Sequence, residues 1–317
     1  MLSYIIQRIF QAIIVIILVS IIIFTIMRTL PADPLLIYLS QDDIVYYTEE
    51  KLDELRHELG LDKSMPMQYI DWISGVVRLD LGDSFHYKQK VTTLIGRSLP
   101  KTVHIGIIAF ILSGIFGIIF GILAAIRRGT WIDNFITPLS NLGVVLPQFW
   151  LGILLIYFFA YKLGWLPTYG YTSPFVDFWL STKQIIMPVI VLMSLPLCLV
   201  TRQMRSSMLE IAGQDYIRTA WSKGLNEKLV IQKHMLRNSL IPVITVMAMG
   251  VPHIFAGSVL VEIVFNISGM GQLLVNATTS SDYNLLQGGM LIIVAVVVAT
   301  NLIVDISYSW IDPRVRY

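Results

Sequence analysis

The stretch DYIRTAWSKGLNEKLVIQKHMLRNSLIP, which runs from Asp215 to Pro242, lies between two strongly apolar runs. It is basic and rich in residues that favour helices. A loop that faces only water needs no apolar cluster around a glycine turn, yet Ile217, Ala220 and Trp221 recur there at helical spacing. We therefore interpret this stretch as a binding surface for another protein beside a membrane.

Two short helices are expected within the stretch. Asp215 is expected to cap the first helix, and Gly224 suits the left-handed position that follows a helix end. Asn226 is expected to start the second helix, and Pro242 to begin the next apolar run. The prediction is an angled pair of helices, hinged at Gly224 and joined rigidly to the apolar runs on both sides.

The composition places the whole chain in a lipid bilayer. Hydrophobic residues make up 55% of the 317 residues and charged residues 14%, whereas soluble domains have about 45–50% and about 25%. The net charge of +2 gives no reason to expect binding to nucleic acid. The single cysteine, Cys198, excludes a disulfide framework and a thiolate metal site, and the five histidines show no ligand spacing.

Six apolar runs reach the roughly 20 residues that a helix needs to cross a bilayer. They cover residues 6–28, 102–126, 136–160, 185–201, 240–261 and 287–308. The first run is longer than the core of a cleavable signal peptide, so we interpret it as a retained span. The fourth run is the weakest, because Pro188 and Pro196 interrupt it.

The distribution of positive charge predicts the orientation. The 202–239 loop carries seven Lys or Arg residues, and the short 126–135 loop carries Arg127 and Arg128. The loops 163–182 and 263–286 carry none. Because cytoplasmic loops are enriched in Lys and Arg, both termini and the 202–239 loop are expected in the cytoplasm.

The segment 31–101 is then an extracytoplasmic insertion, predicted to be helical. Thr48 is expected to cap a helix that ends at Gly60, and a second helix is expected to start at Pro66. The apolar face of the second helix should carry Ile70, Ile73 and Val77. The segment is expected to pack over the membrane helices or to contact a delivering protein.

Few residues within the spans suggest chemistry. A stripe of small residues in the second span predicts close helix packing and consists of Ala109, Ser113, Gly117, Gly121 and Ala125. Glu262 and Asp305 lie near the ends of spans, where a carboxylate is tolerated, and Asp305 is expected to bond with Asn301 or Tyr308. A phosphate-binding glycine loop and the common hydrolase and metalloprotease motifs are absent from the sequence. We therefore predict no catalytic residue, no metal site and no cofactor bound by this chain.

The basic stretch resembles the cytoplasmic loop of the membrane subunits of binding-protein-dependent ABC importers. The general pattern of that loop is Glu-Ala-Ala, three residues, Gly, and here Arg218-Thr219-Ala220 stands in register with Gly224. The glutamate and the first alanine are replaced, as is typical of the peptide and nickel branch, which has Asp-Tyr-Ile-Arg-Thr-Ala. That branch also has His-x-Leu-Arg-Asn, which matches His234 to Asn238.

The resemblance to the dipeptide/oligopeptide permease family extends over nearly the whole chain. Matching segments are Tyr4 to Arg8, Leu30 to Pro34, Leu59 to Asp62, Asp80 to Ser84, Trp165 to Pro167, Val261 to Phe265, Gly269 to Gly271 and Asp312 to Tyr317. Ala32 and Ser268 stand where the family commonly has glycine and proline. The chain is similar to the first of the two permease subunits of such importers.

The resemblance implies an all-α integral membrane protein with six transmembrane helices, the type I ABC importer permease fold and a small helical extracytoplasmic insertion. Residues 1–30 would form the first span, 31–101 the insertion, and 102–317 the five-helix core with the ATPase-docking loop 202–239. The implied docking residues are Asp215, Tyr216, Ile217, Arg218, Thr219, Ala220, Trp221, Lys223, Gly224, Leu225, His234, Arg237 and Asn238.

The implied function is to form half of the import pathway for short peptides in a prokaryotic cytoplasmic (inner) membrane. The implied partners are a second related permease subunit, two ATPase subunits that bind ATP and Mg²⁺, a solute-binding protein and membrane lipid. Nickel, a metallophore or glutathione is an alternative cargo. A secondary transporter or channel that works alone is a distant alternative; it would need ionisable residues in mid-span or inverted repeats. An intramembrane enzyme would need a nucleophile–base or metal set, which the sequence lacks.

Overall fold

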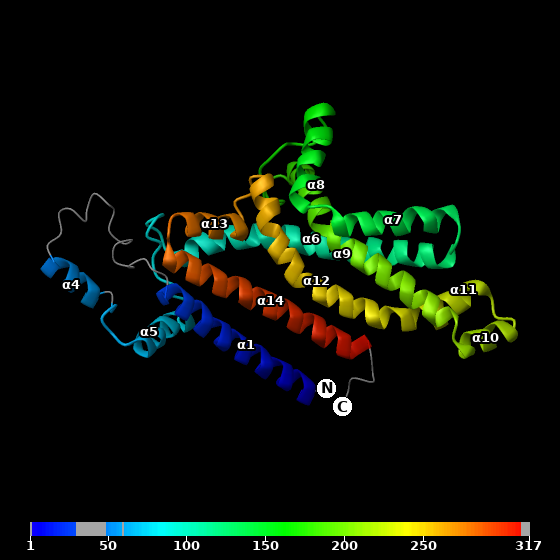
Figure 1. The fold of residues 1–317 in the computed structure, drawn as a ribbon, viewed down its shortest axis with the longest axis horizontal. Coiled ribbons are helices and arrows are strands. Elements are labelled where there is room, and N and C mark those ends of the chain that lie inside the picture. The colour runs from blue at the N-terminus through cyan, green and yellow to red at the C-terminus, as the bar shows by residue number, and fades with distance from the viewer. Residues whose placement is uncertain (1, 30–48, 59, 312–317) are drawn as a thin grey trace.

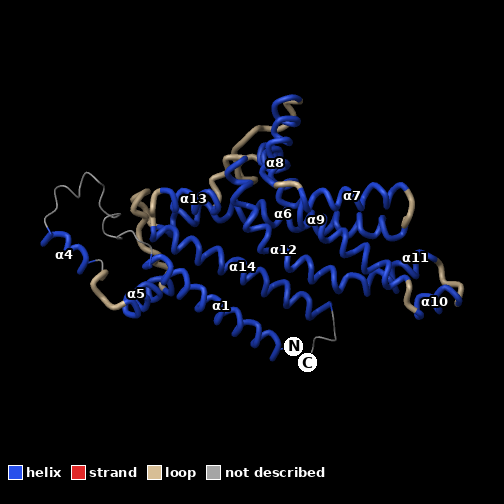
Figure 2. The backbone as a smooth tube through the Cα atoms, in the orientation of Figure 1, coloured by secondary structure: helices blue, strands red, loops and turns tan. Residues whose placement is uncertain are grey.

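The structure, a computed structural model, describes residues 2–29, 49–58 and 60–311. Within these ranges the fold is helical, and the only β interaction is a single bridge between Asp83 and Lys90. The long helices lie side by side along the longest axis of the molecule (Figure 1), and short loops connect most of them (Figure 2). The prediction of an all-α protein is confirmed.

Five helical segments are long and apolar enough to cross a membrane. They are α1 (Leu2–Thr29), α6 (Val91–Ile126), α9 (Phe178–Ala212), the segment Glu227–Val264 that ends in α12 (Arg237–Val264), and α14 (Tyr283–Ile311). Each overlaps one of the apolar runs in the sequence. Five of the six predicted spans are therefore present, and all five are longer than the runs that predicted them.

The predicted third span, 136–160, is not one straight helix. Its residues belong to α7 (Trp131–Val145), α8 (Gln148–Leu155) and the π-helix η1 (Ile156–Lys162), and the chain bends by 110° between α7 and α8. The break falls where Leu146 precedes Pro147, and both residues have extended backbone angles. Proline disfavours the helical conformation of the residue before it, which ends α7 there. The count of spans is six only if this bent pair is one span.

The fourth span is a longer and more buried helix than the sequence suggested. Helix α9 runs without a break through Pro188 and Pro196 and begins before the predicted run and ends after it. Its most apolar window is 56% buried, whereas the corresponding window of α1 is 17% buried. Helices α6, α7, α8 and α12 surround α9, and such neighbours allow a membrane helix to tolerate proline.

Helices α6 and α9 form the most extensive contact in the structure. The small residues of α6 lie in this contact and are buried, as predicted. A Cβ built on Gly117 would lie 2.7 Å from a methyl group of Val200, and one built on Gly121 would lie 2.7 Å from the carbonyl oxygen of Thr201. Only glycine allows these backbones to approach so closely. The stripe is therefore a packing surface.

The predicted insertion, 31–101, contains α4 (Glu49–Glu58) and α5 (Met65–Val77). Gly60 adopts a left-handed conformation with φ +64°, as expected after a helix end, whereas the proposed cap Thr48 lies outside the described residues. The predicted apolar face of α5 does not pack on the described part of the chain, because Ile70 and Val77 are exposed. Helix α5 instead presents Tyr69 and Trp72 to Phe24 of α1, with ring centroids 5.5 and 5.9 Å away.

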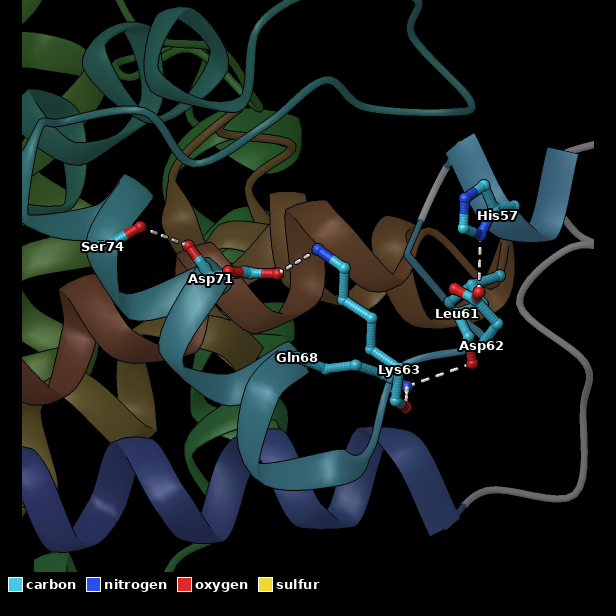
Figure 3. A network of polar contacts seen from close by, with 7 residues as sticks. All are labelled: His57, Leu61, Asp62, Lys63, Gln68, Asp71 and Ser74. Carbon is cyan, nitrogen blue, oxygen red and sulfur yellow. Dashed lines mark hydrogen bonds and ion pairs between the residues drawn. The ribbon is translucent and has the colours of Figure 1, made fainter.

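Polar contacts fix the turn between α4 and α5 (Figure 3). His57 Nδ1 lies 2.6 Å from a carboxylate oxygen of Asp62, and Lys63 Nζ lies 2.7 Å from Asp71. The hydrogen bond with His57 holds the pKa of Asp62 below its ordinary value, and the Asp71 carboxylate raises the pKa of Lys63. Gln68 donates to the carbonyl groups of Leu61 and Lys63. These contacts are exposed, so they orient the turn and contribute little to stability.

Two buried carboxylates hold the opposite end of the bundle from the basic loop. Glu262 accepts hydrogen bonds from Thr102 of α6 and from the backbone of Gln272 in α13 (Met270–Thr279), at 2.5 and 2.9 Å. Asp282 accepts from Ser84 and from the backbone of His86, and so joins the insertion to the start of α14. Both carboxylates face donors that the fold supplies, which identifies them as structural anchors.

Asp305 makes a different contact from the one expected. Its carboxylate lies 3.4 Å from the guanidinium of Arg8, and the pair joins α14 to α1. The side chain of Tyr308, one of its predicted partners, lies outside the described residues. The pair lies near the start of α1 and the end of α14, at the end of the bundle that carries the basic loop (Figure 1).

Candidate functional site

The predicted docking stretch forms a helical elbow at one end of the molecule (Figure 1). Its first helix, α10 (Asp215–Ser222), follows α9 after a short turn. The prediction that Asp215 caps this helix is wrong: Gln214 occupies the cap position without a side-chain bond, and Asp215 is the first helical residue. A carboxylate in the first turn still faces the positive end of the helix dipole.

The end of α10 agrees with the prediction. Gly224 has φ +71°, and nothing lies within 4 Å of a Cβ built on it. Its amide donates to the carbonyl of Trp221, and the amide of Leu225 donates to the carbonyl of Ala220. This pair of bonds is the Schellman motif, which requires a left-handed residue at the glycine position. The elbow is therefore a defined turn.

The inner side of α10 packs against the rest of the chain. Ile217 is fully buried and Ala220 is nearly so. They join one apolar cluster with Met204 and Met208 of α9 and with Val230 at the far side of the turn. Because this cluster links α10 to α9, a force on α10 is transmitted to α9 through packed side chains.

The second predicted helix is not a separate short helix. Asn226 starts it as predicted, and its side chain accepts from the amide of Lys228. The helix then continues through α11 (Glu227–Leu229) and the π-helical segment η2 (Val230–Leu236) directly into α12. Pro242 consequently lies inside the helix and does not begin a new one. π-Helical turns are rare and are frequent at functional sites.

A hydrogen bond joins the two arms of the elbow. The side-chain amide of Asn238 donates to the hydroxyl of Tyr216 and to the carbonyl of His234, at 3.1 Å in each case. His234 and Leu225 are half-buried, and Arg237 is exposed. The structure thus brings the predicted residues of α10 and of the His-x-Leu-Arg-Asn segment into one unit.

The outer side of α10 is exposed. Its predicted residues with exposed side chains or backbone are Asp215, Arg218, Thr219, Lys223 and Gly224. Arg218 and Asp215 form a loose pair at 3.8 Å. Tyr216 and Trp221, 45% and 44% exposed, lie at the two edges between this side and the buried one. The outer side therefore presents charges of both signs with an aromatic ring at each edge.

Sequence reasoning missed one ion pair near the elbow. Asp133, in the first turn of α7, binds both Nε and Nη2 of Arg205 on α9, at 2.7 and 2.9 Å. Asp133 also accepts from the amide of Gly129 and from the hydroxyl of Thr137, at 3.0 Å in each case. The only available signal was a lone acidic residue in a short basic loop, and spacing alone does not pair it with a residue 72 positions away.

Comparisons with known proteins agree with this architecture. The family described as "binding-protein-dependent transport system inner membrane component" matches residues 117–317, and its N-terminal counterpart matches residues 1–106. A putative peptide transport system permease protein of Brucella abortus is 39% identical over 320 residues and covers all of both chains. The di/tripeptide transport system permease protein DppB of Pseudomonas aeruginosa is 34% identical, over all of this chain and 99% of its own length.

The fold has a solved counterpart. A chain of the MetNI methionine ABC transporter, in an inward-facing conformation, superposes with a TM-score of 0.56 at 15% identity, over 69% of this chain and 96% of its own length. The likeness identifies the type I importer permease fold. From the family matches and the full-length relatives, the chain belongs to the binding-protein-dependent ABC importer permeases, in their dipeptide/oligopeptide branch.

Proposed function

We propose that this chain forms half of the pathway of an importer for short peptides, with both termini and the α10 elbow in the cytoplasm. Two ATPase subunits bind and hydrolyse ATP below it, a second related permease subunit completes the pathway, and a solute-binding protein delivers the cargo. The names of the full-length relatives support the peptide cargo. The Lys- and Arg-rich loops at the end that carries α10 support the orientation.

The single observation that carries the proposal is the division of α10 into two sides. Ile217 and Ala220 are buried in the apolar cluster that also contains residues of α9 and η2, whereas Tyr216 and Trp221 are half exposed at the two edges of this buried side. An exposed face with an aromatic ring at each edge is suited to a pocket on a partner, since Trp and Tyr dominate the binding energy of protein interfaces. The ATPases bind this face, and their closure on ATP displaces α10 and, with it, α9 and α12.

Such coupling requires that the outer face contacts two states of the ATPases with different affinity. The elbow has the rigidity this needs, because the Schellman turn and the bond from Asn238 to Tyr216 join its two arms. The chain itself then needs no ATP site.

Substitution of Gly224 by Asp tests the docking. The new side chain must adopt a left-handed backbone and adds a charge at the docking turn, so we expect solute uptake to fall to background while membrane insertion is retained. Gly164→Asp is the matched control, since Gly164 also has a left-handed backbone (φ +63°) and open space around a built Cβ. Gly164 follows η1, far from α10, so this variant should keep its uptake.

The measurement is uptake in cells that carry each variant, together with co-purification of the ATPase subunits. Wild-type uptake by Gly224→Asp would contradict the docking. The cargo is tested separately, by ATP hydrolysis of the assembled importer with its solute-binding protein. We expect stimulation by di- and tripeptides; stimulation by nickel, a nickel chelate or glutathione alone would replace the peptide assignment.

A further inference from the structure

The carboxylate of Asp133 and the guanidinium of Arg205 form the best-formed ion pair of the described residues. The carboxylate is 6% exposed and the guanidinium side chain 27% exposed. Two parallel N–H···O bonds define the orientation of both groups, as is usual for arginine on a carboxylate. The Gly129 amide and the Thr137 hydroxyl fix the carboxylate from its own side. The pair therefore holds the start of α7 against α9 at a defined position and angle.

Arg205 places the ion pair at the end of α9 that is nearest to α10. Arg205 lies near the end of α9, between Met204 and Met208, which belong to the same buried apolar cluster as Ile217 of α10. This end of α9 is also joined to α10 by the short turn at Gly213–Gln214. The ion pair is the polar contact between this end of α9 and α7.

Helix α7 is in contact with α9 along its length and then leaves it. Near the other end of α7, a Cβ built on Gly143 would collide with the sulfur of Cys198, so the two helices are again closely packed there. The chain then bends by 110° at Leu146–Pro147 and continues as α8, which packs against α9 and α12, and then as η1. Helix α7 is therefore held against α9 near both of its ends.

We propose that Asp133 and Arg205 are positioning residues that make α7 move with α9 and α10. Displacement of α10 then reaches α12, through the continuous helix that starts at Asn226, and α7, through α9 and the ion pair. This inference rests on the proposed function, because it requires that ATPases move α10. The pair gives the importer a second mechanical connection, to α7.

The test uses the assembled importer with the buried Cys198 left in place, pairs of spin labels, and two nucleotide conditions, ATP-free and trapped with Mg·ATP and vanadate. The first pair is Leu139 on α7 and Glu210 on α9. The second is Tyr161 on η1 and Ile17 on α1. In the wild type we expect the first distance to stay the same in both conditions and the second to change.

In Arg205→Lys and Asp133→Asn, we expect the first distance to differ between the two conditions, while the second distance still changes with nucleotide. Arg205→Lys keeps the charge and loses the paired geometry, so it remains informative if Asp133→Asn does not fold. Arg202→Lys is the matched control, since Arg202 is exposed on the same helix and makes no ion pair or side-chain hydrogen bond with the described residues.

A pair that only stabilises the fold would lower the thermal midpoint of the variants and leave both distance responses unchanged, and that result would overturn the inference. So would a wild-type α7–α9 distance that changes with nucleotide. Failure of the proposed function has another signature: no ATPase subunit co-purifies with the wild-type chain, or neither distance responds to nucleotide in any variant.

Discussion

Two regions of the molecule end on the same side of the bundle and are built in opposite ways. The α6–α7–α9 core is closely packed: glycines of α6 touch the backbone of α9, and a bidentate ion pair with a buried carboxylate joins α7 to α9. The α1–α14 pair is peripheral. Its most apolar windows are 17% and 11% buried, and a single 3.4 Å contact between Arg8 and Asp305 joins its ends.

The difference indicates which helices transmit force. Interiors packed to high density transmit displacement, whereas helices with a mostly lipid-facing surface can shift relative to their neighbours. Helix α9 of the core leads directly into α10, while α1 contacts α14 and the insertion. We therefore expect the core to follow the docking elbow and α1 to serve mainly as an anchor in the membrane.

The largest contrast should come from removing one carboxylate in each region. Asp133→Ala leaves the Arg205 guanidinium largely buried without a partner, which should cost about 3 kcal/mol. Asp305→Ala removes a pair whose side chains are 37–39% exposed, so its cost should be about 0–1 kcal/mol. The measurement is the unfolding free energy of the purified chain in detergent. Equal losses in the two variants would remove the distinction between the regions.

A smaller contrast is expected from two glycines on one helix. Gly121→Ala brings a methyl group to 2.7 Å from the Thr201 carbonyl and 2.5 Å from Met204, which should cost about 1–3 kcal/mol. Gly96→Ala, near the start of the same helix, meets nothing within 4 Å and should be neutral or stabilise the helix by up to about 1 kcal/mol. The measurement is the thermal midpoint of unfolding of each variant, compared with that of the wild type. A stable Gly121→Ala variant would show that α6 and α9 are not in close contact.

The smallest effect is expected at the contact between α5 and α1. The hydroxyl of Tyr69 lies 2.8 Å from the hydroxyl of Ser20, where α5 meets α1. Tyr69→Phe keeps the ring against Phe24 and removes this bond, so we expect a loss of about 1 kcal/mol and no change in solute uptake. A variant with normal stability and impaired uptake would instead give α1 and α5 a role in transport.

Much of this architecture could be predicted from the sequence, because apolar runs of membrane length and a glycine at a helix end have local causes. Gly224 adopts the expected left-handed conformation, and the small residues of α6 face α9. The bend at Pro147 also has a local cause, yet the apolar run continues through it, so hydropathy alone joined α7 and α8 into one span. The dipeptide Leu146–Pro147 was the signal that marked the break.

The remaining errors have tertiary causes. The proline-containing α9 stays straight because its neighbours surround it, and the pairing of Asp133 with Arg205 arises only once α7 lies along α9. The sequence predicted that the inward side of α10 is apolar, but it could not predict what that side packs against. Ile217 lies in one apolar cluster with the chain's own methionines. Burial therefore reduces the predicted docking residues to the exposed and half-exposed subset, which includes Tyr216 and Trp221.

The most direct test of the docking face is photo-crosslinking in the assembled importer. We place a photoreactive phenylalanine at Trp221, at the edge of the outer side of α10, and as a control at Phe175, which is 98% exposed in the loop between η1 and α9. We predict a covalent adduct between the Trp221 variant and an ATPase subunit, in the nucleotide-free and Mg·ATP conditions, and no such adduct from Phe175. An ATPase that co-purifies with the chain yet forms no adduct at Trp221 in either condition would contradict docking on α10.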